Sequence, residues 1–474
     1  MAINLPSYIA GKAVHSDDKL EVLYPYDNSL TGTVSKINGA QLNEAIEAAI
    51  EGAKNPLSRY ERHAILRKAA ELLAEHREEL AAIICREAGL CMRETMYETG
   101  RCSDVMEFAA IEALKDDGQV FSCDISPQGK NRKIVTFKQP IQLVSAITPF
   151  NHPLNQVAHK VAPAIAAGAP MMLKPSEKTP LTAIRFAELL YEAGLPGWML
   201  SAFVGDLDEV ITPMITDDRV EMVSFTGSVE IGKLIAKTAG YKKTCLELGG
   251  NSPLIVLEDA DMDKAVLLAA EGSFRNSGQR CTAVKRILVQ ESVINEFTTK
   301  FVEKAKEYVA GDPEDPDTRI GTVIDEPAAK YLEDVVNLAV KDGAKVLLGG
   351  KRTGAQIEAT VLSNVSRDSK IVAEESFGPL APIIAIKDLD DAIEYYNGGN
   401  FGLSSGIVTN NMAHALKAAK HLRTGTTNIN EVPGYRIESS PFGGIKDSGL
   451  GIKEGVIEAM KFMQNTKTFS FPWE

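Results

Sequence analysis

The sequence predicts an α/β fold made of two α/β domains and a small β element used for oligomerisation. Three observations lead to this prediction. Residues 41–117 repeat apolar residues at spacings of three and four, which indicates amphipathic helices. From about residue 133 to 430, short β-rich runs alternate with helical segments in two blocks that meet near Pro253. This alternation is typical of parallel sheets with crossover helices. The C-terminal NTKTFSFPWE alternates like an exposed strand, and residues 125–139 are predicted to form a hairpin of similar character. Long exposed strands usually need covering, here by another subunit.

Length and charge exclude several classes of protein. The chain has 474 residues, with 51 basic and 64 acidic side chains and a net charge of −13. At roughly 100–200 residues per domain, this length predicts two to four domains. An acidic chain without a Lys/Arg run argues against nucleic acid or a membrane as partner. The N-terminal segment does not resemble a signal peptide and no long apolar window is present, so a cytoplasmic location is expected.

The cysteines point to reduced thiols. The six cysteines show no CxxC spacing and lie in a long chain rather than a small secreted one. Neither disulfides nor a metal site is therefore expected.

The segment GSVEIGK at Gly227–Lys233 fits the pattern GxxxxGK of nucleoside triphosphate sites. Leu234 follows it, where such a site needs a Ser or Thr hydroxyl for magnesium, so the sequence excludes an ATPase of this type. The segment still ends a β run and opens a helix, whose free N–H groups could receive a pyrophosphate. A plain helix N-cap at Ser228 is the alternative interpretation. No GxGxxG motif is present.

Cys281 is a candidate nucleophile. It lies in NSGQRCTAV, a polar loop between a helix and a strand. The preceding Arg280 and the turn's N–H groups would favour the thiolate. An unreactive loop cysteine is the alternative, since no histidine lies nearby in the sequence.

Glu247 and Asn151 are candidates for the groups that would assist a nucleophile. Glu247 ends a strand in CLELGGNSP, where apolar neighbours should raise its pKa into the range of a general base. Asn151, in ITPFNHP, follows another strand, and its amide could donate to an oxyanion. The alternatives are a strand-end carboxylate satisfied by backbone N–H groups, and an Asx turn before a proline.

Motifs along essentially the whole chain resemble the aldehyde dehydrogenase superfamily in order and spacing. They are PFN at 149–151, KPSE at 174–177, FTGS at 225–228, LELGGNSP at 246–253, GQRC at 278–281, EESFGP at 374–379 and PFGGIKDSG at 441–449. The resemblance implies NAD(P)-dependent oxidation of an aldehyde to an acid. It also implies a Rossmann-like cofactor domain at 1–124 and 144–250, a catalytic domain at 251–435, and an oligomerisation element at 125–143 and 455–474, in a homodimer or homotetramer.

Roles follow from the resemblance residue by residue. Cys281 matches the nucleophile, Glu247 the general base and Asn151 the oxyanion donor. Lys174 and Glu177 match residues at the adenosine ribose, Gly227 and Ser228 the pyrophosphate site, and Glu375 with Phe377 the nicotinamide ribose. Thr148, Phe150, Ser176, Gly205 and Leu248 complete the implied cofactor site. A carboxylate at Glu177 accepts from a ribose 2′-OH and repels a 2′-phosphate, so NAD is favoured, while Lys174 and Lys178 leave NADP possible.

The substrate site departs from the broad family pattern. Arg101, His152 and Arg280, with Thr282, would gather cations in one pocket and so favour a small anionic aldehyde. The combination is most similar to the phosphonoacetaldehyde branch. Glyceraldehyde-3-phosphate (non-phosphorylating), sulfoacetaldehyde and lactaldehyde are the alternatives.

Each cation also has a structural interpretation. Arg101 could be solvated or paired with Glu98 or Asp104, Arg280 could serve the thiolate alone, and His152 could be a satisfied buried histidine. The direction of Arg436 is open.

Two other functions compete: a silent binding member of the fold, and an enzyme that transfers the acyl group to coenzyme A. Intact Cys281, Glu247 and Asn151 argue against the first, and Glu247 against the second.

Overall fold

The computed structural model describes residues 2–473, so the first and last residues of the predicted domains lie outside it. A seven-stranded sheet forms the first domain, in the order β13-β12-β8-β9-β10-β2-β3. Five of its strands are parallel, and β2 pairs antiparallel with both β10 and β3. The bounds are β13 (Lys243–Glu247), β12 (Met222–Thr226), β8 (Val144–Ile147), β9 (Met171–Lys174), β10 (Leu200–Ala202), β2 (Ser7–Ile9) and β3 (Lys12–Val14).

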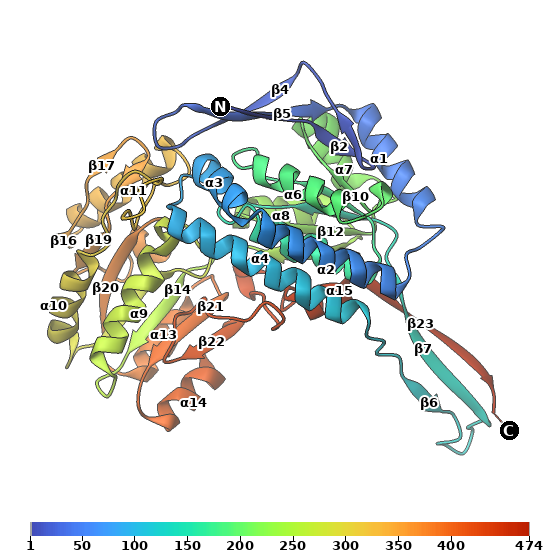
Figure 1. Cartoon of the computed structure of the whole chain (residues 1–474). Helices are drawn as coiled ribbons and strands as arrows, with labels where there is room; N and C mark the ends of the chain where they lie inside the picture. The colour runs from blue at the N-terminus through green and yellow to red at the C-terminus, as the bar shows by residue number, and fades with distance from the viewer. Residues whose placement is uncertain (1, 474) are drawn as a thin grey trace.

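Helices cover both faces of this sheet (Figure 1). The parallel strands are buried except at the start of β13, as expected when both faces are packed. One face carries α2 (Arg59–Glu75), α3 (Arg77–Ala88), α4 (Met92–Ala113), α5 (Asn155–Ala167), α6 (Leu181–Glu192) and α15 (Val456–Phe462). The other carries α1 (Gly39–Gly52), α7 (Thr212–Thr216) and α8 (Val229–Ala239). The helical prediction for residues 41–117 is confirmed by α1 to α4.

A second seven-stranded sheet has the order β16-β19-β20-β15-β14-β21-β22, parallel except for β16. Its strands are β16 (Lys345–Leu348), β19 (Thr360–Ser363), β20 (Leu380–Ile386), β15 (Val284–Gln290), β14 (Ser252–Val256), β21 (Ser404–Val408) and β22 (Thr426–Ile429). One face packs α9 (Met262–Phe274) and α10 (Ile294–Ala305), and the other packs α11 (Glu326–Lys341), α13 (Leu389–Gly398) and α14 (Met412–His421). The predicted fold class, two α/β domains, is therefore confirmed.

Smaller elements complete the chain. A four-stranded sheet joins β1 (Ile3–Leu5), β4 (Lys19–Leu23), β5 (Leu30–Ile37) and β11 (Val204–Gly205). A short hairpin joins β17 (Arg352–Thr353) and β18 (Gln356–Ile357), and α12 (Lys370–Ala373) precedes β20. All six cysteines are free thiols, as predicted. Within residues 2–473, no helix is long and apolar enough to cross a membrane.

A three-stranded arm projects from the body (Figure 1). It consists of β6 (Val120–Ser122), β7 (Arg132–Pro140) and β23 (Gln464–Pro472), with β7 in the middle. The strand ahead of β7 thus lies before residue 125, earlier than the sequence suggested. Residues 455–474 also include the helix α15, which packs on the body. The arm exposes apolar side chains, among them Val120, Phe121, Phe469 and Trp473. The domain boundaries and the homo-oligomer remain predictions.

Candidate active site

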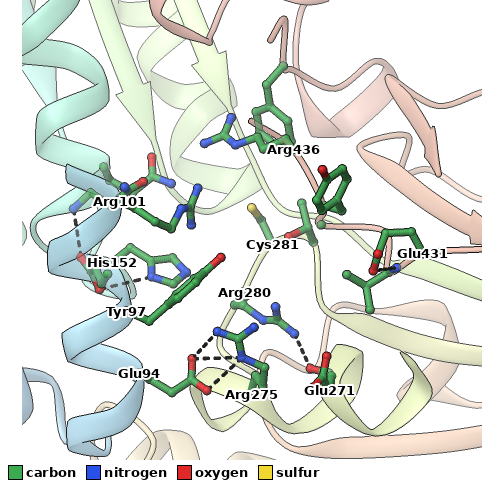
Figure 2. A pocket seen from close by; sticks show the side chains of 18 residues that line it. Glu94, Tyr97, Arg101, His152, Glu271, Arg275, Arg280, Cys281, Glu431 and Arg436 are labelled. Atoms are coloured by element: carbon green, nitrogen blue, oxygen red, sulfur yellow. Dashed lines mark hydrogen bonds and ion pairs between the residues drawn. The ribbon is translucent and has the colours of Figure 1, made fainter. Parts of the chain in front are cut away.

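A cavity of about 210 Å³ lies where the two domains meet. Its wall comes from α4, from the loop after β8, from the loop that carries Cys281 and from residues 431–442. Figure 2 shows Cys281 in this wall, between Arg436 and Arg280 and facing Tyr97 and His152. Side chains far apart in sequence therefore share one small space.

Cys281 lies in the turn between α9 and β15 and is partly exposed. The turn needs unusual backbone conformations: Gly278 has φ +68°, and a Cβ there would collide with the backbone of Gly378. Burial raises the pKa of the Cys281 thiol to about 11. The positive charge of Lys285, and to a smaller degree that of Arg436, opposes this increase. The thiol is therefore not activated by its surroundings alone.

The hydrogen bonds of Arg280 do not go to the Cys281 thiolate, which the sequence suggested it would stabilise. Its Nη2 donates to the carbonyl oxygens of Glu271, at 2.8 Å, and Gly272, at 2.7 Å. These are carbonyls of the last turn of α9, where a cation is favourable. The guanidinium is thus occupied by a helix end, although Arg280 still lines the cavity.

Asn151 is buried in the loop after β8. Its Nδ2 donates to the Gln279 carbonyl at 2.9 Å, and its own carbonyl accepts from Asn276 Nδ2 at 3.0 Å. Both contacts attach Asn151 to the turn that carries Cys281. An amide nitrogen has two hydrogens, so one remains for a second acceptor.

Glu247, the last residue of β13, is 3% exposed. Neither carboxylate oxygen accepts a hydrogen bond from any group within residues 2–473. Burial, followed by the nearby Glu454 carboxylate, raises the pKa of Glu247 well above its usual range, as the sequence predicted. Glu454 itself is held by Lys160 Nζ at 3.1 Å.

The implied cofactor residues follow the carboxyl ends of the strands. Thr148 and Phe150 come after β8, Lys174, Ser176 and Glu177 at the end of β9, Gly205 at the end of β11, Gly227 and Ser228 after β12, and Leu248 after β13. Ser228 caps α8 by accepting from Ile231 N–H at 3.4 Å. A Cβ on Gly227 would come within 2.5 Å of the Phe225 ring. The first turn of α8 is exposed, and the lack of a side chain at Gly227 lets a ligand approach its backbone. This arrangement fits a pyrophosphate.

The second domain completes this crevice with Glu375 and Phe377. Glu375 accepts from Gly250 N–H at 3.1 Å and from Lys285 Nζ, which also donates to the Gly250 carbonyl at 3.0 Å. Phe377 meets Phe150 edge to face, with ring centroids 5.8 Å apart. A Cβ on Gly249 would occupy the place of the Glu375 carboxylate. The residues present therefore fit a dinucleotide that spans both domains.

Arg101 is paired, but not with either residue that the sequence suggested. Its Nε donates to Glu438 Oε1 at 2.5 Å, rather than to Glu98 or Asp104. Glu98 instead accepts from the N–H groups of Leu154 and Asn155, each at 2.9 Å, where α5 begins. The sequence could not reveal this pairing because Glu438 lies 337 residues away.

His152 and Thr282 both line the cavity. His152 Nδ1 lies 3.3 Å from Glu98 Oε2. Sequence reasoning missed four further charged residues of the wall, Arg275, Glu94, Glu271 and Glu431. Arg275 Nε and Nη2 each donate to the Glu94 carboxylate at 3.0 Å. The wall contains four arginines, Arg101, Arg275, Arg280 and Arg436, and an equal number of glutamates, Glu94, Glu98, Glu271 and Glu431. A surplus of cations is therefore not a property of this pocket.

Arg436 lacks the carboxylate partner that Arg101 and Arg275 have, and unlike Arg280 it donates to no carbonyl oxygen within residues 2–473. Its guanidinium stacks on Phe442, with Cζ 4.0 Å from the ring centroid. No carboxylate of the described chain lies within 4.0 Å of it, and its Nη1 is buried without a partner there. Its Nη2 lies 3.5 Å from His159 Nε2. That nitrogen also lies 2.5 Å from Glu438 Oε2, to which it donates, so it offers Arg436 no lone pair.

Comparison with known proteins identifies the family. The family model described as the aldehyde dehydrogenase family matches residues 13–469. The chain belongs to this family. The 3-sulfolactaldehyde dehydrogenase of Priestia aryabhattai is 40% identical over 456 residues, which are 96% of this chain and 95% of that protein.

Solved structures of aldehyde dehydrogenases agree closely with this one. Aldehyde dehydrogenase 21 of Physcomitrella patens, in complex with the reaction product succinate, has a TM-score of 0.96 at 36% identity and covers 100% of this chain and 99% of its own. The NADP-dependent glyceraldehyde-3-phosphate dehydrogenase of Bacillus halodurans, complexed with NADP, has a TM-score of 0.96 at 31% identity and covers 100% of both chains. The chain is therefore an oxidoreductase of aldehydes that uses NAD(P).

Proposed function

We propose that this aldehyde dehydrogenase oxidises a short anionic aldehyde to its carboxylic acid. The observation that carries the proposal is Arg436, a guanidinium without a carboxylate within 4.0 Å among residues 2–473, in the same wall as Cys281. Leaving a partly buried guanidinium without an anionic partner is costly, so a negative group of the substrate is its natural partner.

The chemistry uses the groups around Cys281. The Cys281 thiolate adds to the aldehyde carbon, and the free Asn151 amide hydrogen with the Cys281 backbone N–H holds the oxyanion. Bound NAD(P), held by the residues at the strand ends and by Glu375, supplies the hydride acceptor. Glu247 then takes a proton from the water that attacks the thioester carbon; the C–S bond breaks, the carboxylic acid leaves and Cys281 returns to its thiolate.

Hydrolysis, rather than transfer to coenzyme A, is favoured by Glu247. Its buried carboxylate has a raised pKa, which makes it a stronger base toward water than an ordinary carboxylate. An enzyme that passes its acyl group to a thiol would not need this base. We therefore propose a non-acylating enzyme.

Sulfonated aldehydes of two or three carbons are the substrates best supported. The 40% identical relative is named for 3-sulfolactaldehyde, and the balanced charges of the cavity wall suit a singly charged group. Phosphonoacetaldehyde, which the sequence favoured, is the second candidate because several arginines do face the cavity.

Replacing Arg436 by alanine tests the anion site. Loss of one charge-assisted contact, about 1.5–3 kcal/mol, should lower kcat/KM for sulfoacetaldehyde or phosphonoacetaldehyde by roughly 10- to 100-fold. For propanal, which has no anion, kcat/KM should change little. Arg59→Ala, at an exposed pair with Asp116, is the control and should alter neither substrate. Equal losses for propanal and the anionic aldehydes, or a wild type that prefers propanal, would refute the proposal.

We also propose that NAD is preferred over NADP. Lys174 pairs with the exposed Glu177 at the end of β9, which holds this carboxylate where a ribose is expected. Wild-type kcat/KM should be higher with NAD, and Glu177→Gln should raise the NADP/NAD ratio about tenfold, since the repulsion of a 2′-phosphate is removed. Steady-state kinetics with both cofactors measures the ratio; a wild type that prefers NADP contradicts the proposal.

A further inference from the structure

Glu438 is a buried carboxylate that contacts the cavity residue Arg101. The reaction described above does not use it. It is 5% exposed and lies between β22 and α15. One oxygen accepts from Arg101 Nε at 2.5 Å and the other from His159 Nε2 at 2.5 Å. The segment that carries Arg436 is thereby held to α4 and α5.

Glu438 is ionised in this environment. Burial alone would raise its pKa, but the His159 hydrogen bond and the cations Arg101 and Arg436 outweigh this and hold it well below its usual range. His159 is itself neutral, because burial and Arg436 lower its pKa. Glu438 is therefore paired with Arg101, whereas Arg436 is not in contact with it and acts on it only at longer range.

This charge alters what the cavity can bind. The wall already contains as many glutamates as arginines, four of each, and Glu438 adds a further negative charge next to Arg101. Arg275 is paired with Glu94, and Arg280 donates to carbonyls. Within the part of the chain that the structure describes, neither Arg280 nor Arg436 has a carboxylate partner, and each has a buried nitrogen without an acceptor. Of the two, Arg436 is the one that donates to no carbonyl oxygen, whereas Arg280 donates to Glu271 and Gly272.

We infer that Glu438 determines the charge of the substrate anion: by engaging Arg101, it limits the site to a monoanion such as a sulfonate or carboxylate and disfavours a dianionic phosphonate or phosphate. The inference rests on the proposed function. One guanidinium can neutralise one negative charge, whereas the second charge of a dianion would be opposed by the charge of Glu438. Arg101 is engaged by Glu438, and Arg280 is held by the carbonyl oxygens of Glu271 and Gly272, so neither is free to meet that second charge. Glu438 acts through Arg101 and is therefore a positioning residue.

The test compares two substrates with the same carbon skeleton, sulfoacetaldehyde and phosphonoacetaldehyde. At about pH 8.5 the sulfonate carries one negative charge and the phosphonate nearly two. Wild type should prefer the sulfonate. Glu438→Gln keeps the shape and one of the two acceptor oxygens but removes the charge, so Arg101 becomes available and the phosphonate/sulfonate ratio of kcat/KM should rise at least tenfold.

Control variants separate charge from packing. Glu438→Asp keeps the charge, so the ratio should stay near that of wild type even if overall activity falls. Glu112→Gln removes a largely buried carboxylate of α4 that pairs with Lys115, and should leave the ratio unchanged. A merely structural Glu438 would instead lower kcat/KM for both substrates equally in Glu438→Gln.

The outcomes distinguish the two proposals. A wild type that prefers propanal over both anions overturns the proposed function. A wild type that prefers anions, with the same ratio in Glu438→Gln, overturns only the role of Glu438. If Glu438→Gln does not fold, Arg101→Met provides the measurement: Glu438 is then left uncompensated, and the phosphonate/sulfonate ratio should fall about tenfold. An unchanged ratio in that variant also contradicts the inference.

Discussion

Replacing Cys281 by alanine should abolish aldehyde oxidation while NAD(P) binding persists. The variant lacks the atom that forms the covalent intermediate, so kcat should fall by about four orders of magnitude or more. The cofactor residues lie on other segments, at the ends of β8, β9 and β12 and before β20. Reduced cofactor at 340 nm measures turnover, and a fluorescence titration with NAD measures binding.

Two controls accompany this variant. Cys123→Ala removes the other cysteine that is not fully buried and should leave kcat unchanged. In the cofactor-free wild type, alkylation of Cys281 should accelerate as the pH rises toward its pKa of about 11. A folded Cys281→Ala enzyme with substantial activity would refute the covalent route, and simultaneous loss of NAD binding would indicate misfolding.

Local patterns sufficed for the fold and for part of the site. Strand-helix alternation depends on periodicity within a few residues, so both α/β domains could be predicted. The raised pKa of Glu247 could also be predicted, because its apolar neighbours lie within the same strand. Cys281 was correctly expected in a loop, since Gly278 and polar residues surround it.

The charge pairs of the cavity could not be predicted in the same way. Arg101 was expected to pair within its own helix or to meet the substrate, yet its partner Glu438 comes from a segment beyond β22. Arg280 was expected to stabilise the Cys281 thiolate, but it donates instead to the carbonyl oxygens of Glu271 and Gly272 at the end of α9. In each case the partner is set by the tertiary structure, and the spacing of residues in the sequence does not reveal it. The number of arginines in the sequence therefore overstated the positive charge of the pocket.

Glu247→Gln should slow release of the acid far more than formation of the acyl-enzyme. The amide has nearly the shape of the carboxylate but cannot accept a proton from water, so the thioester on Cys281 should accumulate. In stopped flow, a fast burst of reduced cofactor close to one equivalent per site should precede a steady state that is about 100-fold or more slower than in wild type. Mass spectrometry of the quenched enzyme should detect the acyl group.

The pH dependence distinguishes a base from a packing residue at this position. Because the pKa of Glu247 is raised, the wild-type carboxylate is protonated at low pH and hydrolysis should accelerate as the pH rises through that pKa. Glu247→Gln should lose this increase, whereas Glu230→Gln, at an exposed position of α8, should retain it. Equal slowing of the burst and the steady state would mean that Glu247 acts before the thioester forms. A burst-free variant with the wild-type pH profile would exclude Glu247 as the base.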